Sequence, residues 1–543
     1  MGWRVWRTSQ HALRVASAAA LAALMVVVMV AVAPVARAQD STRAVTRPRT
    51  AYEDLQLFSQ VLNQLRVNHP DSLDTHVLIM AAIRGMVRAA DPHSYVMPAV
   101  RLAPALAELQ RKGKLTPLPI AFTFVGGSPV IASVAPGTKA AQQDVVIGDE
   151  LVAVDGTPVT AESAEELELA LSGAPGSAAA LTLDRMRADG TRARVERRVI
   201  RQHVDDATAV PVAIMLDGTT GYVRVTTFAN TAVADDLHDA LRRLEGKGMQ
   251  RLILDLRDNG GGIVQQAARV AGEFLPTDAV VYSSSGRKKE VIDTGRVKRS
   301  FWRSERRYPI VVMVDQGTAS AAELVAGALQ DHDRALIVGR ATFGKALLMQ
   351  GLPLTDGSMI MLVVGQVRTP CGRLIQRAYR SITSRDYYRL AGEARDTAGR
   401  ASCKTDRGRV VYGGGGIYPD VLLPQPDAAP VWVARLNEAD VWLEWLAGYL
   451  PSDGSRLTTL DAFLADETPS ASAIALFRAL ASKHLIEIPA DADATLWRLM
   501  RRVVAGAKWG EGGALTLRAR GDAQVRAALE SFARAAELRG PGQ

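Results

Sequence analysis

Between residues 251 and 339, short apolar segments alternate with helical ones, and this alternation constrains the fold more than any other feature. The segments "RLILDLR" (251–257), "YPIVVMVD" (308–315) and "RALIVG" (334–339) are largely apolar and predict strands. The stretches "IVQQAARVAGEFL" and "AAELVAGALQD" predict helices. Apolar strands joined by helices indicate a largely parallel sheet with helices on its faces. We therefore expect an α/β core over residues 206–426.

The remaining segments predict further domains around this core. Apolar residues in 51–110 recur at helical spacing, whereas 111–205 holds short alternating segments bounded by glycine and proline. Residues 427–543 are again helical in pattern. The sequence thus predicts a multidomain α/β (α+β) protein with an N-terminal helical region, a β-rich domain, the core and a C-terminal helical extension.

The amino-terminal segment predicts export. Residues 1–38 contain arginines, then an apolar run, then Ala36-Arg37-Ala38, an order typical of a secretory signal cleaved after Ala38. A polar linker follows at 39–50. An uncleaved membrane anchor is the alternative, because the apolar run is nearly long enough to span a bilayer. Both interpretations place the protein in the periplasm or cell envelope, and the second anchors it to the membrane. The net charge of +8 favours peripheral attraction to an anionic membrane face as a further alternative.

Composition excludes several classes of ligand. The net charge is +8, but no dense basic stripe with interleaved aromatic residues indicates a nucleic-acid partner. The two cysteines, Cys371 and Cys403, have no metal-ligand spacing. We expect neither a metal nor another cofactor. Export permits a disulfide between the cysteines, and two buried thiols are the alternative.

Three chemically distinctive features follow the carboxyl ends of the predicted strands, where ligands gather in parallel sheets. Gly260, Gly261 and Gly262 follow the first strand, Ser320 opens the helix after the second, and Lys345 follows the third. A right-handed crossover places the second and third strands side by side. Ser320 and Lys345 are therefore expected to meet at one edge of the sheet.

A lysine at this position suggests a base. Only 11 of the 65 basic residues are lysines, and a lysine, unlike an arginine, can lose its proton and activate a serine hydroxyl. Apolar neighbours in sequence (Phe343, Leu347 and Leu348) would lower the pKa of Lys345 from about 10.4 by desolvation. The N–H of Ala321, at the helix start, and one from the glycine loop would stabilise an oxyanion.

The same residues also fit other interpretations. Ser320 and Glu323 also fit a capping box, in which Ser320 would cap the helix and have no catalytic role. "GRATFGKA" resembles a phosphate-binding loop, but Ala346 stands where serine or threonine would hold magnesium. A serine–histidine–aspartate site is another interpretation, but the sequence has no G-x-S-x-G motif. His332 would lie about 18 Å from Ser320 along a helix. His93 and His238 remain candidates for the histidine of such a site.

Seven segments together resemble the carboxyl-terminal processing proteases, also called tail-specific proteases, from about Tyr52 to Pro424. They are "DPHSYV", "IGDELVAVDGTPV", "LILDLRDNGGG", "GTASAAELVAGALQDHDRALIVGRATFGK", "LPLTDGSMI", "RTPCGRLIQ" and "GGGGIYPDV". The resemblance implies a peptidase with a serine/lysine dyad, a PDZ domain, and no metal or nucleotide.

This resemblance assigns roles to individual residues. It implies Ser320 as nucleophile, Lys345 as base, Gly261 and Ala321 as oxyanion donors, and Glu323 as a supporting acidic residue. The PDZ-like domain, 111–205, would bind the substrate's tail at Ile120, Ala121 and Phe122, or gate the active site. We therefore expect an exported serine endopeptidase that cleaves polypeptides near their C-terminal tails. Its substrates are expected to be unfolded or to have exposed C-terminal tails.

Several positions depart from the family pattern. Met349 stands where the family has a glutamine that orients the lysine, and Gln350 follows it. Gly260 replaces a proline. Pro119 and Ala121 occupy the PDZ carboxylate loop, and proline has no N–H to donate. These departures motivate an alternative, a polypeptide-binding scaffold with little or no activity. The extension at 427–543 lies outside the resemblance and could mediate oligomerisation, bind an adaptor or cover the site.

Overall fold

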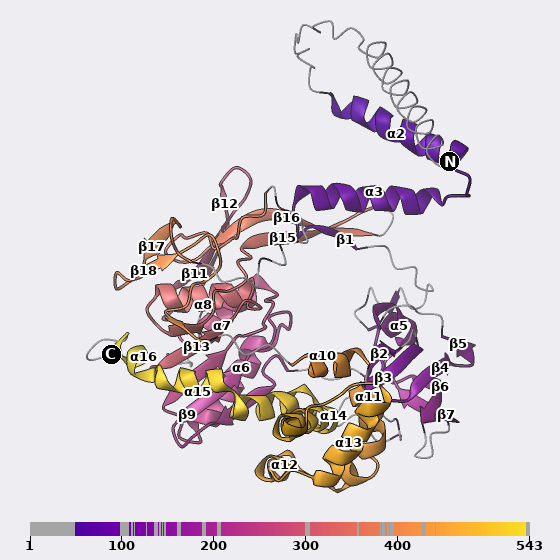
Figure 1. Cartoon of the computed structure of the whole chain (residues 1–543). Coiled ribbons are helices and arrows are strands. Elements are labelled where there is room, and N and C mark those ends of the chain that lie inside the picture. Colours follow the sequence, from indigo (N-terminus) through magenta and orange to yellow (C-terminus); the bar gives the residue numbers. More distant parts are fainter. Residues whose placement is uncertain are drawn as a thin grey trace, which may run out of the picture. The chain divides into compact units, whose positions relative to one another are not determined.

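The computed structural model (Figure 1) describes residues 49–97, 108–109, 112 and 114–538. Within the last range it leaves out 126–127, 135–139, 141–142, 144, 146–147, 160–163, 187–191, 203–207, 299–304, 356–357, 381, 383–385, 388–389, 391–395, 425–429 and 440. The predicted signal and most of the predicted linker lie outside the described residues. The chain divides into two compact units, residues 1–83 and 84–543.

The first unit contains α2 (Ala51–Asn68) and the first part of α3 (Thr75–Ala90). A capping box fixes the start of α2: Thr50 N donates to Glu53 Oε2 at 2.8 Å, and Glu53 N donates to Thr50 Oγ1 at 3.3 Å. This helix buries none of its residues.

The core of the second unit is a six-stranded sheet in the order β19-β14-β13-β10-β9-β8. Its strands are β8 (Val212–Met215), β9 (Thr220–Arg224), β10 (Arg251–Asp255), β13 (Ile310–Val314), β14 (Leu336–Gly339) and β19 (Val421–Leu422). Every neighbouring pair is parallel except β8 and β9. The predicted parallel sheet is confirmed, including the adjacency of β13 and β14.

Both faces of this sheet are buried, which explains why its strands are apolar throughout. Helices α6 (Val233–Glu245), α7 (Val264–Ala271) and α8 (Ala321–Asp331) cover the face that carries Leu252 and Val312. The opposite face, with Ile253 and Val311, packs against α15 (Ala523–Glu530) and α16 (Phe532–Glu537). Figure 1 shows these last two helices, in yellow, beside the sheet. The end of the C-terminal extension therefore completes the core.

A second sheet contains the two strands that come directly after Lys345 in the sequence, together with three strands that precede it. It has the order β1-β16-β11-β12, with β15 also paired to β16. Its strands are β1 (Tyr95–Met97), β11 (Val280–Ser285), β12 (Val291–Arg296), β15 (Leu347–Pro353) and β16 (Met359–Arg368). A short pair, β17 (Ser402–Lys404) and β18 (Val410–Tyr412), lies nearby in sequence. Cys371 and Cys403 form a disulfide, which decides between the two alternatives for the cysteines.

The β-rich domain has the strand order β2-β3-β4-β6-β7, with β5 paired to β4. Its elements are β2 (Ile120–Val125), β3 (Ser128–Val134), β4 (Glu150–Val154), β5 (Thr157–Pro158), α5 (Ala164–Leu171), β6 (Ala178–Met186) and β7 (Arg192–Ile200). Side chains such as Ile131, Leu151 and Leu181 form its separate core. Strand β2 lies at the edge of the sheet.

The rest of the C-terminal extension has its own apolar core around Trp445 and Phe477. Its helices are α10 (Val431–Glu438), α11 (Val441–Tyr449), α12 (Leu460–Ala465), α13 (Ala471–Lys483) and α14 (Asp493–Gly521). Two 3-10 turns lie at Asp453–Arg456 and Ala490–Ala492. Across the described part of the chain, no helix is long and apolar enough to cross a bilayer.

Candidate active site

The structure places Ser320 and Lys345 at the carboxyl ends of neighbouring strands. Ser320 is the N-cap of α8, which follows β13, and Lys345 lies between β14 and β15. Ser320 has φ 55° and ψ −121°, a left-handed φ that is costly for a residue with a Cβ. Such strain persists only where surrounding contacts fix it, and it clusters at functional sites.

The carboxylate of Glu323 ties the two segments together. One oxygen, Oε2, accepts from Ser320 N at 2.9 Å and from Lys345 N at 2.8 Å. The other, Oε1, accepts from Gly344 N at 2.7 Å and Thr342 Oγ1 at 2.5 Å. Glu323 is fully buried, and burial raises its pKa, while these donors oppose that shift. This one carboxylate therefore holds the serine segment against the lysine segment.

The glycine loop packs directly against Ser320. A Cβ on Gly261 would lie 2.7 Å from Ser320 Cβ and 2.8 Å from Ala321 N, and its φ of +88° also favours glycine. Within the described part of the chain, the N–H of Ala321 donates no hydrogen bond. The N–H of Gly261 donates to Asn259 Oδ1 at 2.9 Å. The two predicted oxyanion donors are thus adjacent, and the N–H of Gly261 already donates a hydrogen bond to Asn259.

Lys345 lies in a half-buried position with an unusual electrostatic environment. Burial lowers its pKa, while the carboxylates of Glu323 and Asp91 oppose the shift. Nearby His93 is also affected: burial and the charge of Lys345 lower its pKa to about 4. A neutral imidazole therefore accompanies the amine at neutral pH.

The segment that carries Asp91 and His93 reaches the site as a tight turn. Asp91 Oδ1 accepts from His93 N at 2.8 Å and Ser94 N at 2.7 Å, and Oδ2 accepts from Ser94 Oγ at 2.6 Å. Ser94 Oγ in turn accepts from Val363 N of β16 at 3.0 Å. The "DPHS" stretch is thereby fixed to strand β16 of the second sheet.

An aromatic cluster lies beside this turn. His93 Nε2 is 3.0 Å from the hydroxyl of Tyr387. The Arg377 guanidinium lies over the rings of Phe343 at 4.6 Å and Tyr387 at 4.1 Å. Arg377 is 8% exposed, and none of its guanidinium nitrogens donates a hydrogen bond to a described residue. Stacking on rings, a favourable cation–π arrangement, is its main contact.

The sequence alone did not single out His93 and Arg377 as neighbours of Lys345. His93 lies in "DPHSYV", and Arg377 directly follows "RTPCGRLIQ", but both come from parts of the chain distant from Lys345. Gln376, the last residue of "RTPCGRLIQ", accepts from Ala346 N at 2.8 Å through its Oε1 atom. Gln350, the residue beside Met349, is exposed.

The rival sites do not form. The loop from Gly339 to Lys345 leads into strand β15 rather than a helix, so it is not a phosphate-binding loop. His238 Nδ1 is 3.0 Å from Glu273 Oε2, in the helical layer. His332 caps the far end of α8 and contacts Asp406. His93 does come near Lys345, but its Nε2 atom contacts Tyr387.

The predicted tail-binding residues lie on the edge strand of the β-rich domain. Ile120 and Phe122 are partly buried and pack against its core, while Ala121 between them is exposed. An edge strand presents unpaired backbone groups to which an extended peptide can add. Among the described residues, no cluster of histidine, cysteine and acidic side chains could hold a metal ion.

Models of two protein families match parts of this chain. The model of peptidase family S41 matches residues 219–383, and that of the PDZ domain matches 130–185. The chain is 30% identical to a carboxy-terminal-processing protease of Bartonella bacilliformis, over 60% of this chain and 74% of that protein. It is 31% identical to a chloroplastic C-terminal processing peptidase of Tetradesmus obliquus, over 61% of this chain and 73% of that peptidase. The solved photosystem II D1 C-terminal processing protease matches with 24% identity and a TM-score of 0.35, over 73% of this chain and 91% of that one.

Proposed function

Because the chain belongs to the carboxyl-terminal processing proteases, a family of serine-type peptidases, we propose that Ser320 and Lys345 form its catalytic dyad. The observation that carries this proposal is the shared acceptor: one oxygen of Glu323 binds the backbone N–H of both residues. The lowered pKa of Lys345 favours the neutral amine that a base requires.

The reaction then proceeds through an acyl-enzyme. Ser320 Oγ bonds to the scissile carbonyl carbon while its proton passes to the amine of Lys345. The oxyanion is held by the N–H groups of Ala321 and Gly261, the latter exchanging Asn259 Oδ1 for the substrate oxygen. Cleavage of the C–N bond takes the proton from Lys345 to the leaving amine. Water then gives a proton to Lys345 and attacks the ester carbonyl carbon; the bond to Ser320 Oγ breaks, the new carboxylate leaves, and the proton passes from Lys345 to Ser320 Oγ.

The substrate is a polypeptide with an accessible C-terminal tail. An extended segment of the substrate pairs with β2 at Ile120, Ala121 and Phe122. The pairing uses backbone hydrogen bonds, which depend little on the side chains of the substrate. Pro119 removes one donor at the start of this strand, so the free carboxylate contributes less to binding than the strand pairing. Export to the cell envelope is the further part of the proposal, supported by the order of residues 1–38.

Incubation of the purified protein with casein, an unfolded polypeptide, tests the dyad. We expect cleavage by the wild type and by Lys247→Ala, a matched exposed-lysine control, and none by Ser320→Ala or Lys345→Ala. Circular dichroism of each variant shows whether it is folded. Cleavage that persists in folded Ser320→Ala would overturn the dyad. A wild type that binds casein without cutting it would instead favour the scaffold.

A further inference from the structure

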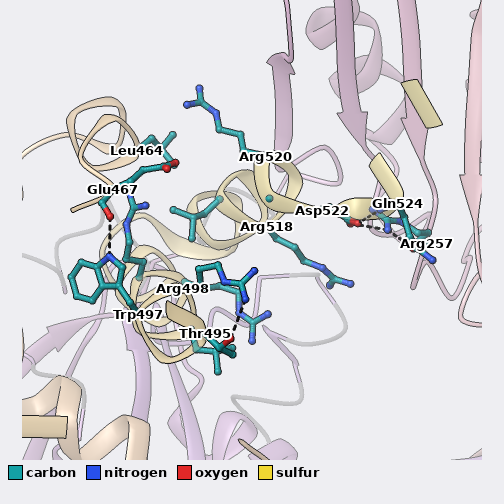
Figure 2. Close-up of a pocket in the computed structure, with 15 residues that line it drawn as sticks. Arg257, Leu464, Glu467, Thr495, Trp497, Arg498, Arg518, Arg520, Asp522 and Gln524 are labelled. Atoms are coloured by element: carbon teal, nitrogen blue, oxygen red, sulfur yellow. Dashed lines mark hydrogen bonds and ion pairs between the residues drawn. The ribbon is translucent and has the colours of Figure 1, made fainter. Parts of the chain in front are cut away.

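A cavity of about 580 Å³ in the C-terminal extension is lined by guanidinium groups (Figure 2). The six arginines around it are Arg257, Arg498, Arg501, Arg502, Arg518 and Arg520. Only two carboxylates, Glu467 and Asp522, share the lining. So large an excess of positive charge in a concave site favours an anionic ligand.

A sharp turn inside α14 creates this arrangement. Trp509 and Gly510 have non-helical dihedrals, and the φ of +68° at Gly510 suits glycine. A Cβ on Gly513 would lie 2.8 Å from the carbonyl oxygen of Ala505, so the two halves of α14 fold back on each other. Arg502 and Arg518, which a straight helix would hold about 24 Å apart, therefore face the same cavity.

Among the described residues, Arg498, Arg501 and Arg502 form no ion pair with a carboxylate. Arg498 donates to Thr495 Oγ1 at 3.1 Å, a neutral acceptor. Arg501 is 7% exposed; it donates to the Phe463 carbonyl, and its Nε has no partner. Burial and the charge of Arg518 lower the pKa of Arg502, as expected where guanidinium groups lie close together.

We infer that this cavity binds a phosphate-bearing anion with at least two negative charges, held by Arg498, Arg502 and Arg518. Guanidinium groups bind phosphate oxygens through paired N–H donors, and several of them converge here. The phosphate could be carried by a small soluble molecule or by a lipid headgroup, since both present the same oxygens.

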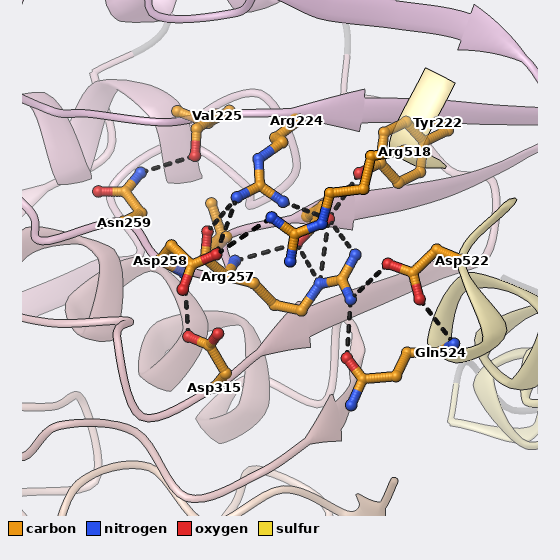
Figure 3. A network of polar contacts seen from close by, with 12 residues as sticks. Tyr222, Arg224, Val225, Arg257, Asp258, Asn259, Asp315, Arg518, Asp522 and Gln524 are labelled. Carbon is orange, nitrogen blue, oxygen red and sulfur yellow. Dashed lines mark hydrogen bonds and ion pairs between the residues drawn. The ribbon is translucent and has the colours of Figure 1, made fainter. Parts of the chain in front are cut away.

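A network of polar contacts joins residues that line the cavity to Asp258, which lies just before the glycine loop (Figure 3). Arg257 donates to Asp255, at the end of β10, and pairs with Asp522 at 2.8 Å. Arg518 lies 3.8 Å from Asp258, which precedes Asn259, the acceptor for Gly261 N–H. A phosphate held by Arg518 competes with Asp258 for that guanidinium group. We therefore expect its binding to alter the loop from Asp258 to Gly262.

Isothermal titration of the full chain with inorganic pyrophosphate tests the binding site. Replacing Arg498 and Arg502 together by glutamine should weaken binding at least tenfold, because two charge-assisted contacts are lost. The control, Arg534→Gln on α16, removes an exposed arginine outside the cavity and should bind as the wild type does. Thermal unfolding shows that each variant is folded.

Co-sedimentation with phosphatidylcholine vesicles containing phosphatidic acid distinguishes the sources of phosphate. Sedimentation that the double variant loses supports a lipid headgroup, and pyrophosphate binding alone supports a soluble ligand. Binding of neither probe, or equal binding by the wild type and the double variant, overturns the site. Amide hydrogen exchange tests the connection: unchanged exchange over 255–262 at saturating pyrophosphate would refute it. None of these readouts depends on the proposed dyad.

Discussion

Replacing Glu323 by glutamine tests whether one buried carboxylate holds the serine and lysine segments together. The substitution preserves shape but turns one of two acceptor oxygens into an NH₂ donor. All four groups around the carboxylate are donors: Ser320 N, Lys345 N, Gly344 N and the Thr342 hydroxyl. The new amide must therefore place its NH₂ group against two of them.

The two orientations of the amide differ in cost. If the NH₂ faces Ser320 and Lys345, two buried N–H groups lose their acceptor. If it faces Thr342 and Gly344, only Gly344 N–H is orphaned, because the threonine hydroxyl can turn. An orphaned buried donor costs about 1–3 kcal/mol, so the second orientation should prevail. We expect Glu323→Gln to lose about 1–3 kcal/mol of unfolding free energy.

Urea unfolding and peptide cleavage measure the two consequences. Because the Gly344–Lys345 segment relaxes, we expect kcat to fall at least tenfold with little change in KM. Glu530→Gln, on the exposed side of α15, is the control and should leave both unchanged. If Glu323→Gln unfolds within about 0.5 kcal/mol of the wild type, as a surface change would, and keeps its kcat, the shared carboxylate does not position the dyad.

Three further predictions concern charge, the disulfide and the core. Burial lowers the pKa of Lys345 below 10.5, so the native state holds this proton less tightly than the unfolded chain. Wild-type kcat/KM should therefore rise with pH through that lowered pKa, and inactive Lys345→Met should unfold at a higher temperature than the wild type at neutral pH. This difference should shrink as pH rises toward 10.5; a difference independent of pH would contradict the assignment. Cys371→Ser opens a disulfide that spans 32 residues, and thermal unfolding should show a loss of about 4 kcal/mol in unfolding free energy, reproduced by a reductant. Equal stability of the reduced and oxidised protein would show that the link is dispensable. Phe532→Ala should lose about 3–5 kcal/mol in urea, because this ring is 5% exposed against the central sheet. A loss below 1 kcal/mol would mean that α16 is not part of the core.

Much of the site could be predicted from the order of motifs along the chain. Strand–helix alternation placed Ser320 and Lys345 after strands that a right-handed crossover makes neighbours, and β13 and β14 are indeed paired. The capping box of Ser320 and Glu323 was also predicted. Its carboxylate, however, binds the lysine segment as well as the helix start, which local pattern cannot reveal.

Other neighbours of Lys345 could not be predicted because they arrive from far along the chain. Asp91 and His93 lie about 250 residues before it, on a turn fixed to β16 by Ser94. Arg377 lies over the ring of Phe343, and its N–H donates to Gly344 O at 2.9 Å. Each contact depends on long-range packing, whereas periodicity and turn chemistry report only on residues close in sequence.

The sequence by itself determined that the central sheet must be covered twice, since strands such as 251–255 and 310–314 are apolar on both sides. Only the tertiary structure decided which segment provides the second cover. That segment is α15 and α16, some 200 residues further on, and their amphipathic pattern would fit many apolar surfaces. Apolar burial is non-directional, so a pattern shows that a face must be covered, while shape and connectivity select what covers it.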